Sequence, residues 1–183
     1  MKIENIQEAG QILLKYLKNN KNILILGEGY LSGKTSLLNE IISNLENKEK
    51  ILFISRMDEL RKKNKGINHI VADGDKYSRI DYEMIEKQGY ETVLIDDAES
   101  FEIDEKGKIV FSFELVNVVV YLMKERKMNL AFSLDRGRKE DIKSIIHFFD
   151  ELNQKQHKKK VIDVAVVASV DSKMKHSFKI LEL

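Results

Sequence analysis

The 183-residue chain contains no cysteine, no proline and no tryptophan. Without cysteine, neither a disulfide framework nor a thiolate metal site can form, which suits a reducing compartment. A strong charge of one sign is also missing, because 31 basic and 30 acidic residues leave a net charge of +1. Proteins that bind mainly to phosphate backbones usually carry a clear basic excess, so nucleic-acid contact would need a local patch.

Long apolar runs are absent as well. No segment approaches the roughly 18 uncharged apolar residues of a membrane-spanning helix. The first residues include Glu4 and Glu8 and lack the apolar core of a signal peptide. We therefore expect a soluble, cytoplasmic protein that makes no use of a membrane.

Apolar residues make up 43% of the chain, which is enough for one packed core. We expect a single domain over residues 1–183, in which residues 1–20 are an N-terminal helix. The periodicity predicts helices at 4–19, 35–45, 79–88, 113–127 and 141–153, although the valines at 118–120 would also suit a strand. It predicts strands at 22–26, 51–55, 67–71, 92–95, 130–134, 161–170 and 178–183.

Helices that alternate with short, continuous apolar strands are typical of an α/β fold. We expect a mainly parallel sheet with helices on both faces. In such a sheet, ligands bind at the carboxyl ends of the strands. Gly27, Asp96 and Ser133 fall at or near the ends of three expected strands, so these three segments predict one site.

The first expected strand leads into a glycine-containing loop and then a helix. Glycines allow backbone N–H groups to turn inward around phosphate oxygens, and the helix amino end adds further donors. Lys34 would reach the β- and γ-phosphates of a nucleotide, and Thr35 would ligate Mg²⁺. The residues predicted to bind ATP, or GTP, with Mg²⁺ are Gly29, Ser32, Gly33, Lys34, Thr35 and Ser36. Tyr30, at the tip of the loop, would either stack on a base or pack locally.

The strand predicted at 92–95 ends in two carboxylates. This segment resembles a Walker B motif. The resemblance implies that Asp96 would join Thr35 in holding Mg²⁺ and that Asp97 would orient or deprotonate an attacking water, the role that a glutamate usually takes in additional-strand ATPases. Lys34 and Asp97 are therefore the predicted catalytic residues. A strand that ends in two aspartates is also compatible with a plain solvated turn.

These segments together resemble the RecA-like ATPase core, particularly that of DnaB-type hexameric helicases. Gly33-Lys34-Thr35 is similar to a Walker A motif, and Ile95-Asp96-Asp97 to a Walker B motif. Segments 51–55, 132–138, 162–169 and 176–183 are similar to the family's second strand, sensor loop and closing pair of strands. The resemblance implies a three-layer P-loop NTPase fold, ATP hydrolysis and a place in a homo-oligomer or larger ATPase assembly.

Three features depart from the family pattern. Glu28 stands where Walker A usually has its first glycine, and its carboxylate would repel phosphates unless it pointed away. Met57 stands where the family often has a catalytic glutamate. Lysines, rather than an arginine finger, occur near the final strands; Arg136 and Arg138 lie on another loop.

The sequence leaves several functions open. The first is a RecA-like ATPase of nucleic-acid metabolism, the second a nucleotide-dependent regulatory module with little hydrolysis, and the third a small-molecule or nucleotide kinase. Basic runs at 61–65 and 155–160 are either nucleic-acid contacts or solvated surface. The histidines at 69, 147, 157 and 176 lack metal-site spacing and predict no zinc site.

Overall fold

The computed structural model describes residues 1–29, 31–55, 66–71, 87–96, 101–103, 109–111, 128–136, 139–154 and 160–183. Its helices are α1 (Ile6–Lys18), α2 (Lys34–Asn44), the short 3₁₀ helix η1 (Lys48–Lys50) and α6 (Lys139–Gln154). Its strands are β1 (Lys2–Ile3), β2 (Ile23–Glu28), β3 (Ile51–Ser55), β4 (Asn68–Val71), β5 (Thr92–Ile95), β6 (Phe101–Ile103), β7 (Ile109–Phe111), β8 (Asn129–Arg136), β9 (Val164–Val170) and β10 (His176–Glu182).

One eight-stranded sheet runs through the molecule in the order β1-β10-β9-β2-β8-β5-β3-β4. The pairings from β9 through β4 are parallel, whereas β10 pairs antiparallel with both β9 and β1. The predicted mainly parallel sheet with a closing pair of strands is therefore confirmed. One strand, β8, lies between β2 and β5, so it separates the strand that leads into the glycine-containing loop from the strand that leads into Asp96.

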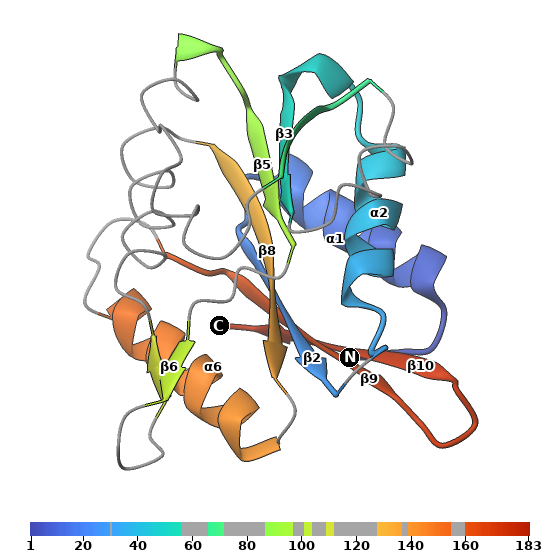
Figure 1. Ribbon diagram of the computed structural model, residues 1–183, viewed down its shortest axis with the longest axis vertical. Helices are drawn as coiled ribbons and strands as arrows, with labels where there is room; N and C mark the ends of the chain where they lie inside the picture. The colour runs from blue at the N-terminus through green and yellow to red at the C-terminus, as the bar shows by residue number, and fades with distance from the viewer. Residues whose placement is uncertain are drawn as a thin grey trace.

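Helices cover both faces of this sheet, as Figure 1 shows, with α1 and α2 on one side and α6 on the other. Alternate residues of each buried strand face opposite ways. Ile23, Phe53 and Leu94 pack with the helices α1 and α2. Leu24 and Leu52 belong to the other apolar layer, which contains residues of α6. These two apolar layers confirm a three-layer α/β fold.

Several boundaries differ from the sequence prediction. Residues 1–20 are not one helix, because Lys2 and Ile3 form β1 and Asn5 caps the start of α1 by accepting a bond from Glu8 N. The separate hairpin of β6 and β7 was not predicted. The strand expected at 130–134 extends to Arg136, so most of the segment 132–138 is strand, and Ser133 lies within this strand as expected. The helices expected at 79–88 and 113–127 fall mostly or wholly outside the described residues.

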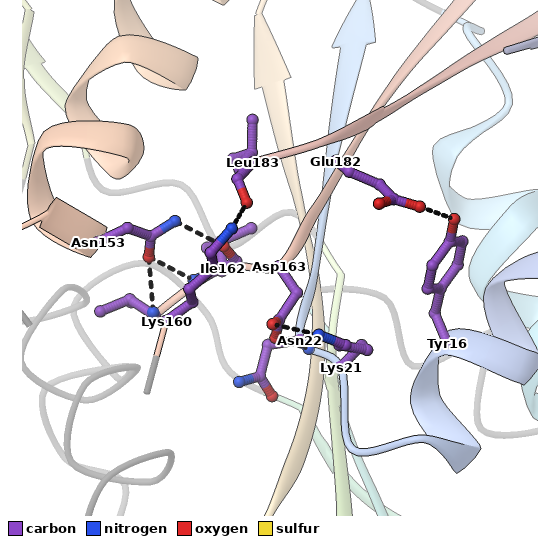
Figure 2. A network of polar contacts seen from close by, with 10 residues as sticks. Tyr16, Lys21, Asn22, Asn153, Lys160, Ile162, Asp163, Glu182 and Leu183 are labelled. Carbon is purple, nitrogen blue, oxygen red and sulfur yellow. Dashed lines mark hydrogen bonds and ion pairs between the residues drawn. The ribbon is translucent and has the colours of Figure 1, made fainter. Parts of the chain in front are cut away.

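Two buried asparagines hold the amino-end edge of the sheet together (Figure 2). The Asn153 side chain accepts hydrogen bonds from Val161 N at 2.7 Å and Ile162 N at 3.1 Å, and donates to Ile162 O at 2.7 Å. The Asn22 side chain accepts a bond from Leu130 N, at 3.2 Å. Both side chains satisfy backbone groups where α6, β2 and β8 meet the segment that leads into β9, and so fix how these elements join.

In the part of the chain that the structure describes, no helix is long and apolar enough to cross a bilayer.

Candidate functional site

Three described residues of the loop between β2 and α2 have left-handed backbone conformations. Gly29, Leu31 and Gly33 have positive φ angles of 86°, 59° and 94°. Left-handed residues next to ordinary ones can turn successive N–H groups toward one side of a chain, which is the backbone arrangement of an anion-binding nest. Gly33 is also the N-cap residue of α2, and the N–H groups of the helix's first turn have no intrahelical acceptors. The loop therefore presents donors and the positive end of a helix dipole.

Two side chains close over the start of this loop. A Cβ atom at Gly27 would lie 2.6 Å from Lys34 Cδ and 2.7 Å from Ser32 Oγ, so only glycine leaves room for both. Lys34 is 8% exposed and Ser32 is 1% exposed. The Ser32 hydroxyl has no hydrogen-bond partner among the described residues. A buried polar atom without a partner carries an energetic cost, which a bound anion would remove.

The carboxylate of Glu28 does not obstruct the loop. Gly27 faces Lys34 and Ser32, which lie at the start of α2. Glu28 is the next residue of the same strand, and successive side chains of a strand point to opposite faces. Glu28 therefore lies on the α6 side of the sheet, away from the nest. The repulsion that its position in the motif suggested does not arise.

Asp96 follows β5 directly and lies beside the loop. Its carboxylate is 2% exposed. Asp96 Oδ2 accepts a 2.7 Å hydrogen bond from Thr35 Oγ1, and Asp96 Oδ1 accepts a 2.7 Å bond from Ser133 Oγ. The two residues predicted to share a metal ion, 61 positions apart in sequence, are thus in direct contact. A hydroxyl and a carboxylate at this distance form the oxygen donor pair that Mg²⁺ prefers.

Ser133 lies in the strand where it was expected, and its side chain contacts Asp96. It lies on β8, between the strands that carry the loop and Asp96, and it is 0% exposed. From there its hydroxyl fixes the second carboxylate oxygen of Asp96. The sequence signal was a serine among apolar residues in a buried strand.

His176, which the sequence analysis assigned no role, lies against the loop. A Cβ atom at Gly33 would be 3.1 Å from His176 Nδ1, and the imidazole stacks on Phe178 with ring centroids 6.4 Å apart. His176 Nδ1 is buried and lacks a hydrogen-bond partner within the described ranges. No local motif predicts this contact, because it depends on β10 lying two strands from β2.

The remaining predicted residues are placed as follows. Ser36 is exposed on the first turn of α2, and Gly29 lies at the loop entrance. Asp97 and Tyr30 lie outside the described residues, as do Met57 and Arg138. Their predicted roles stay predictions.

A cavity of about 200 Å³ lies at the opposite edge of the sheet. It is lined by residues at the starts of β3, β5 and β8, including Ile51, Thr92 and Asn129. Since the loop, Thr35 and Asp96 all lie at the carboxyl edge, this cavity is separate from the site described above.

Comparison with known proteins gives a fold and no family. No family model and no curated protein matches the sequence. Among solved structures, the VirB11 ATPase of the Brucella suis type IV secretion system, in complex with sulphate, is similar over 97% of this chain at 13% identity, with a TM-score of 0.59. The chain spans 53% of that ATPase. A Bacteroides Pif1 helicase bound to ADP-AlF3 and single-stranded DNA aligns over 81% of this chain and 37% of its own, at 14% identity and a TM-score of 0.40. The likeness to VirB11 shows an α/β fold of the P-loop NTPase type.

Proposed function

We propose that this protein binds a nucleoside triphosphate, ATP or GTP, in the nest between β2 and α2. The contact between Thr35 Oγ1 and Asp96 Oδ2 carries this proposal, because it brings the loop and the acidic strand into one site. Glycine-dependent packing of Lys34 and the unpartnered Ser32 hydroxyl support it. Phosphates would accept bonds from the backbone of Gly29–Ser36, and the Lys34 ammonium would neutralise their charge.

The residues present also suit Mg²⁺. Thr35 and Asp96 supply oxygen atoms of the kind this ion takes, and the Ser133 bond keeps the Asp96 carboxylate in one orientation. When bound, Mg²⁺ would supply positive charge that neutralises negative charge on the phosphates. In the proposal Asp97 orients the attacking water, and residues 1–183 form one catalytic domain.

The activity we propose is ATP hydrolysis by a RecA-like enzyme that works within an oligomer in nucleic-acid metabolism. The strand inserted between β2 and β5 fits the additional-strand class to which RecA-like ATPases belong. A regulatory module with little turnover is the second candidate, and the methionine at position 57, in place of the family's glutamate, favours it. A small-molecule or nucleotide kinase is a weaker third.

Lys34→Ala tests nucleotide binding. Since Lys34 would make charge-assisted bonds to phosphate, its loss should weaken ATP binding by about 10- to 100-fold, the equivalent of about 1.5–3 kcal/mol. Isothermal titration calorimetry measures this affinity, and Lys48→Ala, an exposed lysine of η1, is the control. Equal ATP affinity in Lys34→Ala and wild type would remove the basis of the proposal.

Hydrolysis assays then separate the candidate activities. Turnover stimulated by single-stranded DNA, duplex DNA or RNA supports the nucleic-acid ATPase. Tight ATP binding without turnover supports the regulatory module, and transfer of phosphate to a hydroxyl or nucleotide acceptor supports the kinase.

A further inference from the structure

A row of buried polar residues crosses three neighbouring strands next to the phosphate loop. Ile54 pairs with Ile95, and Ile95 with Phe132, so the next residues along β3, β5 and β8 lie side by side: Ser55, Asp96 and Ser133. Asp96 N continues the pairing by donating to Ile54 O at 2.8 Å. Ser55, Asp96 and Ser133 are each at most 2% exposed.

All three side chains belong to the sheet face that α2 covers. Phe53, Leu94 and Ala131 each precede a member of the row by two positions, and all three pack in the apolar layer of α1 and α2. Because strand side chains alternate with a period of two, the row points to the same face as Thr35. Ser55 is therefore the neighbour of Asp96 on the side opposite Ser133.

Ser55 is held by a histidine from the edge strand β4. Its Oγ lies 2.8 Å from His69 Nε2. The imidazole stacks on Phe53, with ring centroids 5.2 Å apart and an interplanar angle of 18°. This packing limits rotation of the ring and fixes the direction of the bond to Ser55. His69, for which the sequence predicted no role, is therefore hydrogen-bonded to Ser55, the neighbour of Asp96.

We propose that His69, acting through Ser55, is a positioning residue of the Asp96 site. This inference rests on the nucleotide-binding function proposed above. A serine hydroxyl has one hydrogen to donate and two lone pairs. When His69 Nε2–H donates to Ser55 Oγ, the serine hydrogen is left to donate toward Asp96 or toward water on the bound metal. His69 thereby fixes the direction in which the Ser55 hydroxyl donates its hydrogen. At position 57, the sequence has methionine instead of glutamate.

Residues that hydrogen-bond to metal ligands without touching the metal typically change metal affinity or activity by about 10- to 100-fold when they are mutated. Their contribution is to the metal-dependent step and not to the phosphate nest, which is built from residues 29–36 of the loop. The proposal therefore separates two quantities: ATP affinity without Mg²⁺ stays the same, whereas the Mg²⁺ concentration for half-maximal effect, and turnover at saturating ATP, respond to His69 and Ser55.

The test uses the full chain and three variants, His69→Leu, His69→Gln and Ser55→Ala, with ATP and MgCl₂ as the ligands. Calorimetry gives ATP affinity with and without Mg²⁺, and phosphate release gives kcat and KM. We expect His69→Leu and Ser55→Ala to raise the half-maximal Mg²⁺ concentration or lower kcat by about tenfold or more. His69→Gln keeps an N–H donor and should restore most of the loss. Ser177→Ala, which removes a hydroxyl from the part-buried Ser169–Ser177 pair, is the control.

The outcomes distinguish this inference from the function on which it rests. Wild-type values in both His69→Leu and Ser55→Ala overturn the positioning role and leave nucleotide binding intact. Equal losses in His69→Gln and His69→Leu, or equal losses with and without Mg²⁺, also overturn it, because they indicate a purely structural role. Failure of the wild-type protein to bind ATP overturns both proposals. If His69→Leu does not fold, Ser55→Ala and His69→Gln decide the question.

Discussion

At the scale of single residues, the site depends on two glycines, at positions where a Cβ atom would contact neighbouring side chains too closely. Gly33 combines a left-handed φ of 94° with a tight approach of the His176 ring, whose Nδ1 lies 3.1 Å from where a Cβ would be. Gly27 leaves room for the folded side chains of Lys34 and Ser32. These two glycines are required for different reasons, the first for backbone conformation and close approach, the second for close approach alone.

Gly33→Ala should destabilise the protein and weaken ATP binding. The left-handed conformation alone costs a residue with a Cβ about 1–2 kcal/mol, and contact with His176 adds to this. Urea unfolding measures the effect. Gly89→Ala is the matched control, since Gly89 also has a positive φ, 71°, but open space around it. A loss at position 33 no larger than that at position 89, together with normal ATP affinity, would contradict the described loop geometry.

Part of the site at this scale could be predicted from the sequence and part could not. Thr35 and Asp96 were paired in advance because the two motifs carry chemical roles that require proximity, and the 2.7 Å bond agrees. Ser133 was expected near the end of its strand and at the same site, but no local pattern predicted its bond to Asp96. Ser55, His69 and His176 were missed because their contacts depend on which strands are neighbours, and no local pattern contains that information.

At the scale of elements, the last two strands, β9 and β10, extend the sheet on one side of β2, the strand that leads into the loop. β9 pairs with β2, β10 pairs with β9, and β1 returns to pair with β10. The turn between β9 and β10 is held by Asp171 Oδ1, which accepts bonds from Lys173 N at 2.8 Å and Lys175 N at 2.9 Å. These bonds, that from Lys175 first, hold the pKa of Asp171 below its ordinary value. The hairpin places His176 against Gly33.

Asn153→Ala should loosen the junction of α6 with the segment that leads into β9. The change leaves Val161 N, Ile162 N and Ile162 O without their buried partner. We expect a loss of about 2–3 kcal/mol in the free energy of unfolding, since unsatisfied buried groups cost about 1–3 kcal/mol each and water would reach some of them. Urea unfolding measures it, with the exposed Gln154→Ala as control. A loss below about 0.5 kcal/mol, the usual range of surface changes, would mean that these bonds contribute little.

Element types were easier to predict from the sequence than element ends. Buried strands such as β3 and β5 appear at the predicted residues because continuous apolar runs bounded by polar ones have few alternatives. The short strand β1 was missed because two residues carry no periodicity, and its pairing with β10 joins residues almost a chain length apart. The hairpin of β6 and β7 was missed because three-residue strands give a weak pattern.

At the scale of the whole molecule, the order of the strands determines which side chains meet at the proposed site. Parallel strands bring Gly27, Asp96, Ser133 and Ser55 to one edge and one face of the sheet. Insertion of β8 between β2 and β5 leaves room for Ser133 to reach Asp96 from the middle strand. The class of fold followed from alternating helices and strands. The strand order did not, because many orders are compatible with the same apolar pattern.

The central claim is that backbone amides of the loop after β2 bind phosphate groups. Titration of ¹⁵N-labelled protein with Mg²⁺ and a non-hydrolysable ATP analogue, followed by amide NMR, tests it directly. The account predicts saturable shifts that are largest at Gly29, Gly33, Lys34 and Thr35, and their loss in Lys34→Ala. Saturable shifts confined to the amino edge of the sheet, or no shifts at millimolar analogue, would contradict it.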